Sequence, residues 1–156
     1  MKVRVIGSGC SEHSIARQFN VYPSVNKVYV APGNDGMKSD AECVKISATD
    51  FEALASFAKE NAIDLTFVGP EQPLAEGIVD YFAERGLQAF GPNKAAALIE
   101  GSKSFAKELM AKYNIPTAGY GTFTDAEEAK AVIREKDAPI VIKEDGQDAR
   151  NAVNVG

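Results

Sequence analysis

The chain has 156 residues, 45% of them hydrophobic and 25% charged, which is typical of one soluble globular domain, or of one domain plus part of another. Its formal net charge of −5 argues against nucleic acid as the main partner, because phosphate backbones demand clustered lysine and arginine. Cys10 and Cys43 match no zinc or redox spacing, and two cysteines are too few for a disulfide-rich secreted scaffold. No apolar run approaches transmembrane length, and Arg4 interrupts the N-terminal one, so we expect a cytoplasmic protein without a membrane partner.

The first 13 residues predict a buried strand, a tight glycine turn and a helix. Residues 3–6 are apolar and rich in β-branched side chains, Gly-Ser-Gly follows at 7–9, and a helix pattern runs from Ser11 to about Asn20. This layout directs backbone N–H groups and a helix N-terminus at one point, which favours the binding of a phosphate or carboxylate there. Glu12 stands where the dinucleotide fingerprint has its third glycine, so a ligand site and a plain turn both remain open.

Strands alternate with helices as far as residue 92. Further strands are predicted at 27–30, 44–47, 63–69 and 87–90, and helices at 51–61 and after Pro73. In the second of these helices Leu74, Ile78 and Phe82 recur at steps of four, which predicts one continuous helix. The alternation predicts an α/β fold, a doubly wound parallel sheet of Rossmann-like type with right-handed crossovers.

The alternation of single strands with single helices ends at residue 92. The pattern predicts two helices at 94–100 and 102–113, a hinge at 114–117 and a strand at 120–123. A helix opened by Thr124 and Asp125 follows, and then two strands at 140–143 and 152–155. We therefore expect a first domain over 1–116 and a second module over 117–156. With only about 40 residues the second module is near the lower limit for independent folding, and it is predicted to be incomplete.

Glycine, proline and polar residues follow four of the predicted strands. Because the carboxyl ends of parallel strands share one edge of a sheet, these loops should converge and form a small-molecule site. The groups concerned are Gly7, Gly9, Glu12, His13, Pro32, Gly33, Asn34, Gly69, Pro70, Glu71, Gly91 and Pro92. Glycine and proline at strand ends are also ordinary turn residues, which is the competing interpretation.

Several of these residues allow two interpretations when taken singly. We expect no carboxylate or nucleophile to be fixed beside the side chain of His13, which favours capping or packing over catalysis. Cys10 lies near a helix N-terminus, where thiolates are stabilised, but a plain turn residue is the simpler interpretation. Glu71 could bind an amine or a ribose hydroxyl, or simply start a helix. Lys103 lies near a helix start, where the helix dipole does not favour a lysine, and Lys143 lies at a strand end. A bound polyphosphate would explain the position of Lys103, and a solvated lysine is the alternative.

Several segments together resemble the glycinamide ribonucleotide synthetases (phosphoribosylamine–glycine ligases), ATP-grasp enzymes of purine synthesis. These segments include VYVAPGN, VGPEQPLAEGIVD, EGSKSFAK and APIVIKEDG. The resemblance implies that residues 117–156 begin an α+β ATP-grasp lobe. It also implies a reaction in which ATP phosphorylates the glycine carboxylate and the amine of phosphoribosylamine attacks the acyl phosphate, giving glycinamide ribonucleotide, ADP and phosphate.

The resemblance implies roles for particular residues. Strand-end loops of the first domain would hold phosphoribosylamine through Gly9, Glu12, His13, Gly33, Asn34, Pro70, Glu71 and Gly91. Lys103 and Lys143 would contact the phosphates of ATP. The Mg²⁺ ligands are expected outside this chain, so no metal-binding residue is assigned, and neither a catalytic residue nor an oligomeric state is predicted.

The sequence also departs from the family pattern at two places. Cys10 and Ser11 replace a glycine and an arginine of the family. Residues 147–152 lack the glycines and the lysine of the loop that closes over the ATP phosphates in the family, and Glu144 places an acidic residue where those phosphates should approach. We expect this chain alone to be inactive as a ligase. A non-catalytic module that binds a phosphorylated ligand or a partner protein is the alternative. An NAD-dependent dehydrogenase is a weaker one, because residues 31–34 lack the acid that would accept the ribose hydroxyls.

Overall fold

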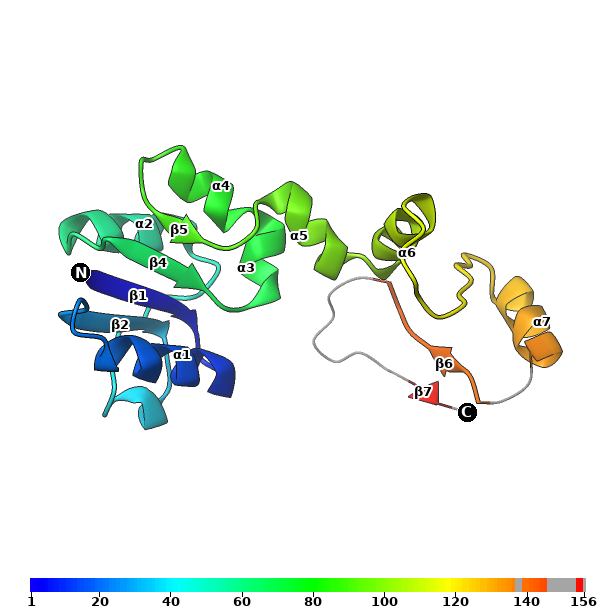
Figure 1. Cartoon of the computed structure of the whole chain (residues 1–156), viewed down its shortest axis with the longest axis horizontal. Helices are drawn as coiled ribbons and strands as arrows, with labels where there is room; N and C mark the ends of the chain where they lie inside the picture. The colour runs from blue at the N-terminus through cyan, green and yellow to red at the C-terminus, as the bar shows by residue number, and fades with distance from the viewer. Residues whose placement is uncertain (137–138, 146–153, 156) are drawn as a thin grey trace. The chain divides into compact units, whose positions relative to one another are not determined.

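The computed structural model describes residues 1–136, 139–145 and 154–155 (Figure 1). Contacts between Cα atoms divide the chain into two compact units, Met1–Ala97 and Leu98–Gly156. This division precedes the expected domain boundary at 116–117, because the helices that follow residue 97 group with the C-terminal segment. The boundary at 116–117 stays a prediction about the domains.

The first unit is built on a five-stranded sheet in the order β3-β2-β1-β4-β5. Every neighbouring pair of strands is parallel, which confirms the predicted parallel sheet. The strands are β1 (Lys2–Gly7), β2 (Lys27–Pro32), β3 (Glu42–Cys43), β4 (Leu65–Val68) and β5 (Ala89–Phe90). The helical elements between them are α1 (Cys10–Val21), the 3-10 turn η1 (Asp35–Met37), α2 (Phe51–Glu60), α3 (Glu71–Glu76) and α4 (Ile78–Ala83).

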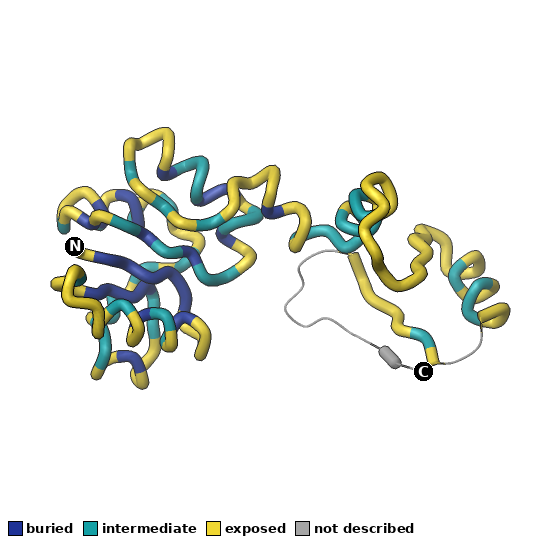
Figure 2. Tube along the Cα trace, in the orientation of Figure 1, coloured by how far each residue is buried: buried dark blue, intermediate teal, exposed yellow. Residues whose placement is uncertain are grey.

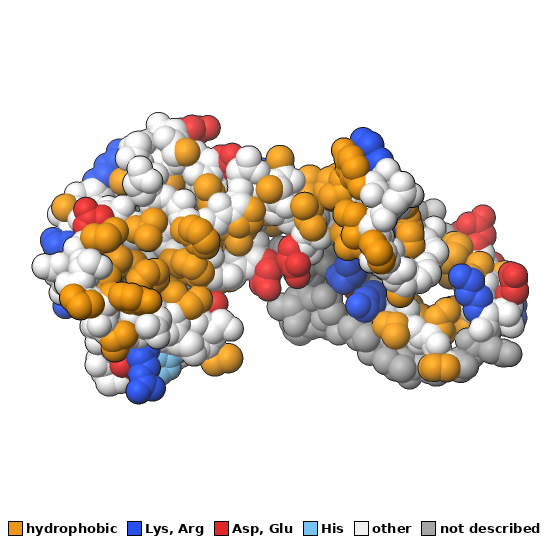
Figure 3. Space-filling model, viewed as in Figure 1, with side chains coloured by type: hydrophobic (Ala, Val, Ile, Leu, Met, Phe, Trp, Pro, Cys, Tyr) orange, Lys and Arg blue, Asp and Glu red, His pale blue; other side chains and the backbone are white. Residues whose placement is uncertain are grey.

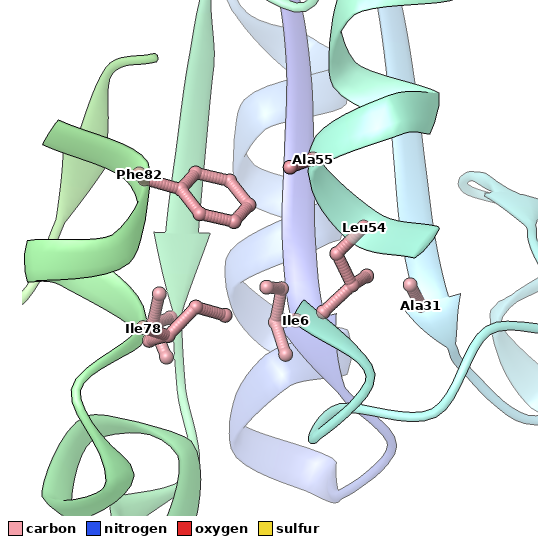
Figure 4. Packing of buried hydrophobic residues seen from close by; sticks show 7 residues of the cluster. Ile6, Ala31, Leu54, Ala55, Ile78 and Phe82 are labelled. Atoms are coloured by element: carbon pink, nitrogen blue, oxygen red, sulfur yellow. The ribbon is translucent and has the colours of Figure 1, made fainter. Parts of the chain in front are cut away.

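The two faces of the sheet carry separate cores. Side chains alternate along a strand, so successive residues of β1 point to opposite faces. Val5 packs with Ala16 of α1 and Met37 of η1, whereas Ile6 packs with residues of α2 and α4 (Figure 4). Both faces of the sheet are therefore covered, which confirms the doubly wound arrangement.

Two predicted elements of the first unit differ in the structure. The third strand was expected at 44–47 but occupies Glu42–Cys43. The Val44 N–H still donates to the Val30 carbonyl oxygen (2.8 Å), but the Ile46 N–H donates to the carbonyl oxygen of Val44 itself (2.7 Å). The chain has thus turned away from the sheet edge, and Ile46 packs against the core that contains α2.

The continuous helix predicted after Pro73 is wrong, because Gly77 divides it into α3 and α4. Gly77 adopts a left-handed conformation (φ 99°) that ends one helix and begins the next. Leu74, Ile78 and Phe82 nevertheless all contact the same hydrophobic core. The spacing of four therefore identified the buried face correctly, although the axis of the helix is broken.

In its described residues, the second unit contains two full helices and a short antiparallel pair of strands. Its elements are α6 (Lys103–Lys112), α7 (Ala126–Lys136), β6 (Val141–Ile142) and β7 (Asn154–Val155), and α5 (Lys94–Gly101) crosses the division between the units. The predicted start of α7 is confirmed, since the Asp125 carboxylate accepts hydrogen bonds from the N–H groups of Glu127 and Glu128. The strand predicted at 120–123 is wrong: these residues have no neighbouring strand to pair with among those described.

The two units differ in burial. In the first unit β1 and β2 are largely buried, whereas none of residues 98–136 and 139–145 is buried (Figure 2). Apolar side chains also gather on the surface of the first unit over the strands of the sheet (Figure 3). The aromatic rings of Phe67 and Phe90 stack with centroids 5.3 Å apart, and Phe90 is 62% exposed.

Candidate functional site

The loops that follow three strands meet at the C-terminal edge of the sheet. The Gly33 N–H donates to the Gly7 carbonyl oxygen (3.1 Å), and the Gly69 N–H donates to the carbonyl oxygen of Ile6 (3.1 Å). Asn34 Nδ2 donates to the Ser8 carbonyl oxygen (2.8 Å). β1 lies between β2 and β4, so the direction of winding reverses here, which is where open α/β sheets bind ligands.

Glu12 occupies the space between the ends of β1 and β4. Its side chain is 9% exposed, and Oε2 accepts a hydrogen bond from the Gly9 N–H (2.7 Å) at the start of α1. A Cβ atom on Gly7, Gly9 or Gly69 would lie 2.4, 2.7 or 2.5 Å from an atom of this side chain. The three glycines therefore make room for the Glu12 side chain. The position at the glycine turn where an anionic ligand was expected already holds the Glu12 carboxylate.

Asn34 joins two loops through its side-chain amide. Oδ1 accepts from the Gly36 N–H (2.8 Å) and caps η1, while Nδ2 holds the backbone of Ser8. Gly33 before it has a left-handed conformation (φ 68°) and lies against Cys43. Both residues shape the site by positioning backbone, so contact with a substrate remains a prediction.

His13 is paired with a carboxylate that its sequence neighbourhood does not reveal. Its Nε2 lies 2.9 Å from Oδ2 of Asp40, which comes from the segment after η1. The hydrogen bond with His13 lowers the pKa of Asp40 below its ordinary value, with a smaller effect from Ser39. An open hollow of about 430 Å³ adjoins the pair, lined also by Ser14 and Arg17. The expectation that no carboxylate stands beside His13 is thus wrong, because the fold brings Asp40 to it.

Three further predicted residues lie after β4 and β5. Pro70 is the N-cap of α3, and Glu71 is exposed in its first turn. A Cβ atom on Gly91 would lie 2.6 Å from Leu74 and 3.3 Å from Val79. Gly91 therefore permits close packing of its loop, and of the three only Glu71 presents an exposed polar side chain.

The second unit joins the segments that carry the two predicted nucleotide-binding lysines. Lys103 is the first residue of α6, and Lys143 is exposed just after β6. The Asp145 carboxylate accepts hydrogen bonds from the backbone N–H groups of Lys103 (2.7 Å) and Ser104 (3.2 Å), and from Ser102 Oγ (3.3 Å). A further hydrogen bond, with the Ser104 side chain, is the largest cause that lowers the pKa of Asp145, and the bonds with the backbone N–H groups and with Ser102 lower the pKa as well.

Sequence reasoning missed Asp145, because nothing in its local pattern indicates a distant helix start. Ser102, just before the same helix start, accepts from the Phe105 N–H. The altered loop at 147–152 lies outside the described residues.

Within 1–136, 139–145 and 154–155 no group of three or more His, Cys, Asp or Glu could hold a metal ion. No helix in that part of the chain has both the length and the apolar character needed to cross a membrane.

Known proteins match the chain along its whole length. Residues 1–100 match the family model of the phosphoribosylglycinamide synthetase N domain, and residues 101–156 match that of the ATP-grasp (A) domain. A phosphoribosylamine–glycine ligase of Halalkalibacterium halodurans is 58% identical over 99% of this chain and 36% of the relative. One of Streptococcus pyogenes is 56% identical over 94% of this chain and 35% of the relative. The chain thus spans about a third of the length of these curated relatives.

Solved structures support the same assignment. The crystal structure of phosphoribosylamine–glycine ligase from Thermotoga maritima matches with a TM-score of 0.72 and 27% identity, over 100% of this chain and 36% of that one. An N5-carboxyaminoimidazole ribonucleotide synthetase of the same organism matches with a TM-score of 0.70 at 21% identity, covering 97% of this chain and 40% of that one, and shows likeness of fold alone. The chain belongs to the phosphoribosylglycinamide synthetase family.

Proposed function

We propose that this chain provides the sugar-binding domain and the beginning of the nucleotide-binding domain of a phosphoribosylamine–glycine ligase. The observation that carries the proposal is the adjoining match of the N domain over 1–100 and the ATP-grasp domain over 101–156. The gathering of the strand-end loops at the β1–β4 edge supports it, since this edge binds ligands in open α/β folds. The cytoplasm, where small-molecule biosynthesis takes place, is the proposed location.

Phosphoribosylamine is the proposed ligand of the first unit. Gly9, Glu12, Gly33 and Asn34 lie at or beside the crevice between the strand ends, and His13, Pro70, Glu71 and Gly91 belong to the same set of loops. Contact with the sugar phosphate through these residues is our proposal.

ATP is the proposed ligand of Lys103 and Lys143. Asp145 holds the segment that follows β6 at the start of α6, so the segments bearing the two lysines are joined, as a shared phosphate site requires. Cationic side chains on phosphate oxygens would offset the charge that develops as the γ-phosphoryl group is transferred. Mg²⁺ would be held mainly by oxygen ligands from the rest of the protein, since this chain spans 36% of a relative.

Calorimetric titration with ATP in the presence of Mg²⁺ tests the nucleotide part of the proposal. Replacing Lys143 by alanine should weaken binding about tenfold, the cost of one charge-assisted hydrogen bond. Lys59→Ala, at the exposed end of α2, should leave the affinity unchanged. Equal affinities of the wild type and Lys143→Ala would contradict the assignment of Lys143.

An assay of ADP release with glycine, phosphoribosylamine and ATP tests the activity. We expect the 156-residue chain to show no turnover, because it has only about a third of the length of its relatives. Turnover at the rate of a full-length relative would refute this expectation.

A non-catalytic module that binds a phosphorylated ligand is the second candidate. The replacement of the family's usual Gly-Arg by Cys10 and Ser11 at the glycine turn favours it. Binding of phosphoribosyl compounds without any binding of ATP would support this candidate over the first.

A further inference from the structure

Asp145 binds the start of α6, although it lies 42 residues beyond Lys103 in the chain. Its Oδ1 accepts from the N–H groups of Lys103 (2.7 Å) and Ser104 (3.2 Å). Ser102 Oγ donates to Oδ2 of the same carboxylate (3.3 Å). Lys143 precedes Asp145 by only two residues, and both segments lie in the second unit. One side chain therefore fixes the backbone of one lysine-bearing segment against that of the other.

These bonds leave the start of α6 without an N–H group for a phosphate. A helix start leaves four N–H groups unpaired, those of its N-cap and of its first three residues. In α6 the Ser102 N–H donates to the Leu98 carbonyl oxygen (3.0 Å), and the Phe105 N–H donates to Ser102 Oγ (3.2 Å). Asp145 accepts from the other two. Since helix starts bind phosphate through such N–H groups, a phosphate near α6 is left with side chains as its partners.

The carboxylate also accounts for a lysine at the first position of α6. The helix dipole disfavours a cation there, and Asp145 supplies a negative charge at the same end. Lysine side chains are long and flexible, so two of them can share one polyphosphate at low entropic cost only if their backbones are held in place beforehand. The bonds of Asp145 provide this preorganisation.

We propose that Asp145 is a positioning residue for nucleotide binding. It holds the backbone at Lys103 and Lys143 so that both side chains can reach the phosphates of one ATP molecule, and it does so from the helix start without contacting the nucleotide. The proposal rests on the proposed function and deepens it, because it assigns the residue that sets the arrangement of the two lysines.

Calorimetric titration of the 156-residue chain with ATP and Mg²⁺ tests this role. Asp145→Ala removes the link, whereas Asp145→Asn keeps the oxygen that accepts from the two N–H groups. Asp125→Ala is the matched control, because Asp125 caps α7 in the same unit. Its carboxylate accepts from the N–H groups of Glu127 (2.9 Å) and Glu128 (3.0 Å). The control thus loses a cap of the same kind at a different helix.

We expect Asp145→Ala to weaken ATP binding about tenfold and Asp125→Ala to change it by less than about twofold, although both remove a helix cap. Asp145→Asn should restore the affinity to within about threefold of the wild type. In a Lys143→Ala background, Asp145→Ala should cost less than it does in the wild type, because one of the positioned side chains is gone.

Two results would overturn the assignment of Asp145. Equal losses in Asp145→Ala and Asp125→Ala would show that the residue only stabilises the unit. Tighter binding of ATP in Asp145→Ala and Asp145→Asn would show that its carboxylate repels the phosphates. Should Asp145→Ala not fold, Asp145→Glu replaces it, because the longer side chain moves the segment while keeping the charge; an unchanged affinity in that variant would overturn the assignment as well.

Failure of the assignment can be told apart from failure of the proposed function. If the wild type does not bind ATP, the nucleotide part of the proposed function fails, and the role of Asp145 fails with it. If ATP binds and the affinity depends on Lys143 but not on Asp145, only the role of Asp145 fails.

Discussion

Arg4 is a buried cation in the middle of the central strand. It is 0% exposed, and no carboxylate pairs with it in the part of the chain that the structure describes. Nη1 donates to the Leu54 carbonyl oxygen (2.6 Å) and Nη2 to Thr66 Oγ1 (3.1 Å), while Nε has no partner. Burial lowers the pKa of Arg4 to about 10, so the side chain still carries its charge at pH 7. The charge therefore costs stability that two hydrogen bonds offset only in part.

Arg4→Met should raise the free energy of unfolding by about 1–2 kcal/mol at pH 7, because a flexible apolar side chain removes the buried charge. Urea denaturation followed by circular dichroism measures it. The pKa of Arg4 is lower in the folded than in the unfolded chain, so the cost is constant below about pH 10 and falls as the pH rises further. Lys59→Met, an exposed charge on α2, is the control, and a loss of more than 1 kcal/mol in Arg4→Met would contradict the argument.

Gly69→Ala should destabilise the first unit by about 1–3 kcal/mol, as overpacking does. The new Cβ atom would lie 2.5 Å from Oε1 and 2.6 Å from Cγ of Glu12. Thermal or urea unfolding should also show that Glu12→Ala relieves the added cost, giving a coupling of about 1 kcal/mol or more in a double-mutant cycle. Gly119→Ala, where a Cβ atom meets nothing within 4 Å, is the control. Additive effects of the two substitutions would show that the contact is unimportant.

The sequence predicted the turn at Gly7–Gly9 but not the reason for its glycines. Strand, turn and helix follow from local pattern, whereas the meeting of Glu12 with Gly69 depends on β1 pairing with β4. The same holds for His13 and Asp40. Side-chain partners that are distant in the sequence were therefore beyond prediction, although the loops that carry them were correctly expected at one edge.

At the level of elements, local caps were predictable and long-range ones were not. Ser102 and Asp50 cap α6 and α2, and a capping residue just before an amphipathic run is a local feature of the sequence. The break at Gly77 was missed because the apolar spacing of four continues across it, and spacing reports the buried face rather than the backbone. The strand at 44–47 was misplaced because Ile46 packs against the core while its N–H bonds to Val44 and not to a neighbouring strand.

The hydrogen bonds of Asp145 to α6 predict a pH-dependent link between β6 and that helix. Its pKa lies below the ordinary 3.8, so the link is complete above pH 3.8 and is lost as the pH falls through the folded-state pKa. Carboxyl NMR titration should give a midpoint below 3.8, and the amides of Lys103 and Ser104 should titrate with it. In Ser104→Ala the midpoint should rise toward 3.8, because the largest cause of the shift is removed. Ser56→Ala should leave it unchanged, and a wild-type midpoint at or above 3.8 would contradict the link.

At the level of the whole molecule, the two units should differ in stability. The first unit has cores on both faces of its sheet, formed by fully buried residues such as Ile6, Val30 and Phe82. The second has no buried residue in 98–136 or 139–145, and Phe105, Tyr120 and Phe123 are each at least 38% exposed. Buried apolar area is the main source of folding free energy, so the second unit has much less of it.

Native-state hydrogen exchange should therefore show two levels of protection. Amides of β1, β2 and α2 should exchange only through global unfolding of the first unit, whereas those of α6 and α7 should exchange through openings of lower free energy. Addition of ATP and Mg²⁺ should raise protection in α6 if Lys103 and Lys143 bind the nucleotide, because a ligand stabilises the state that binds it. Lys143→Ala serves as the control for that increase. Equal protection of β1 and α6 without ligand would mean that the units unfold as one, and that burial within the second unit is a poor guide to its stability.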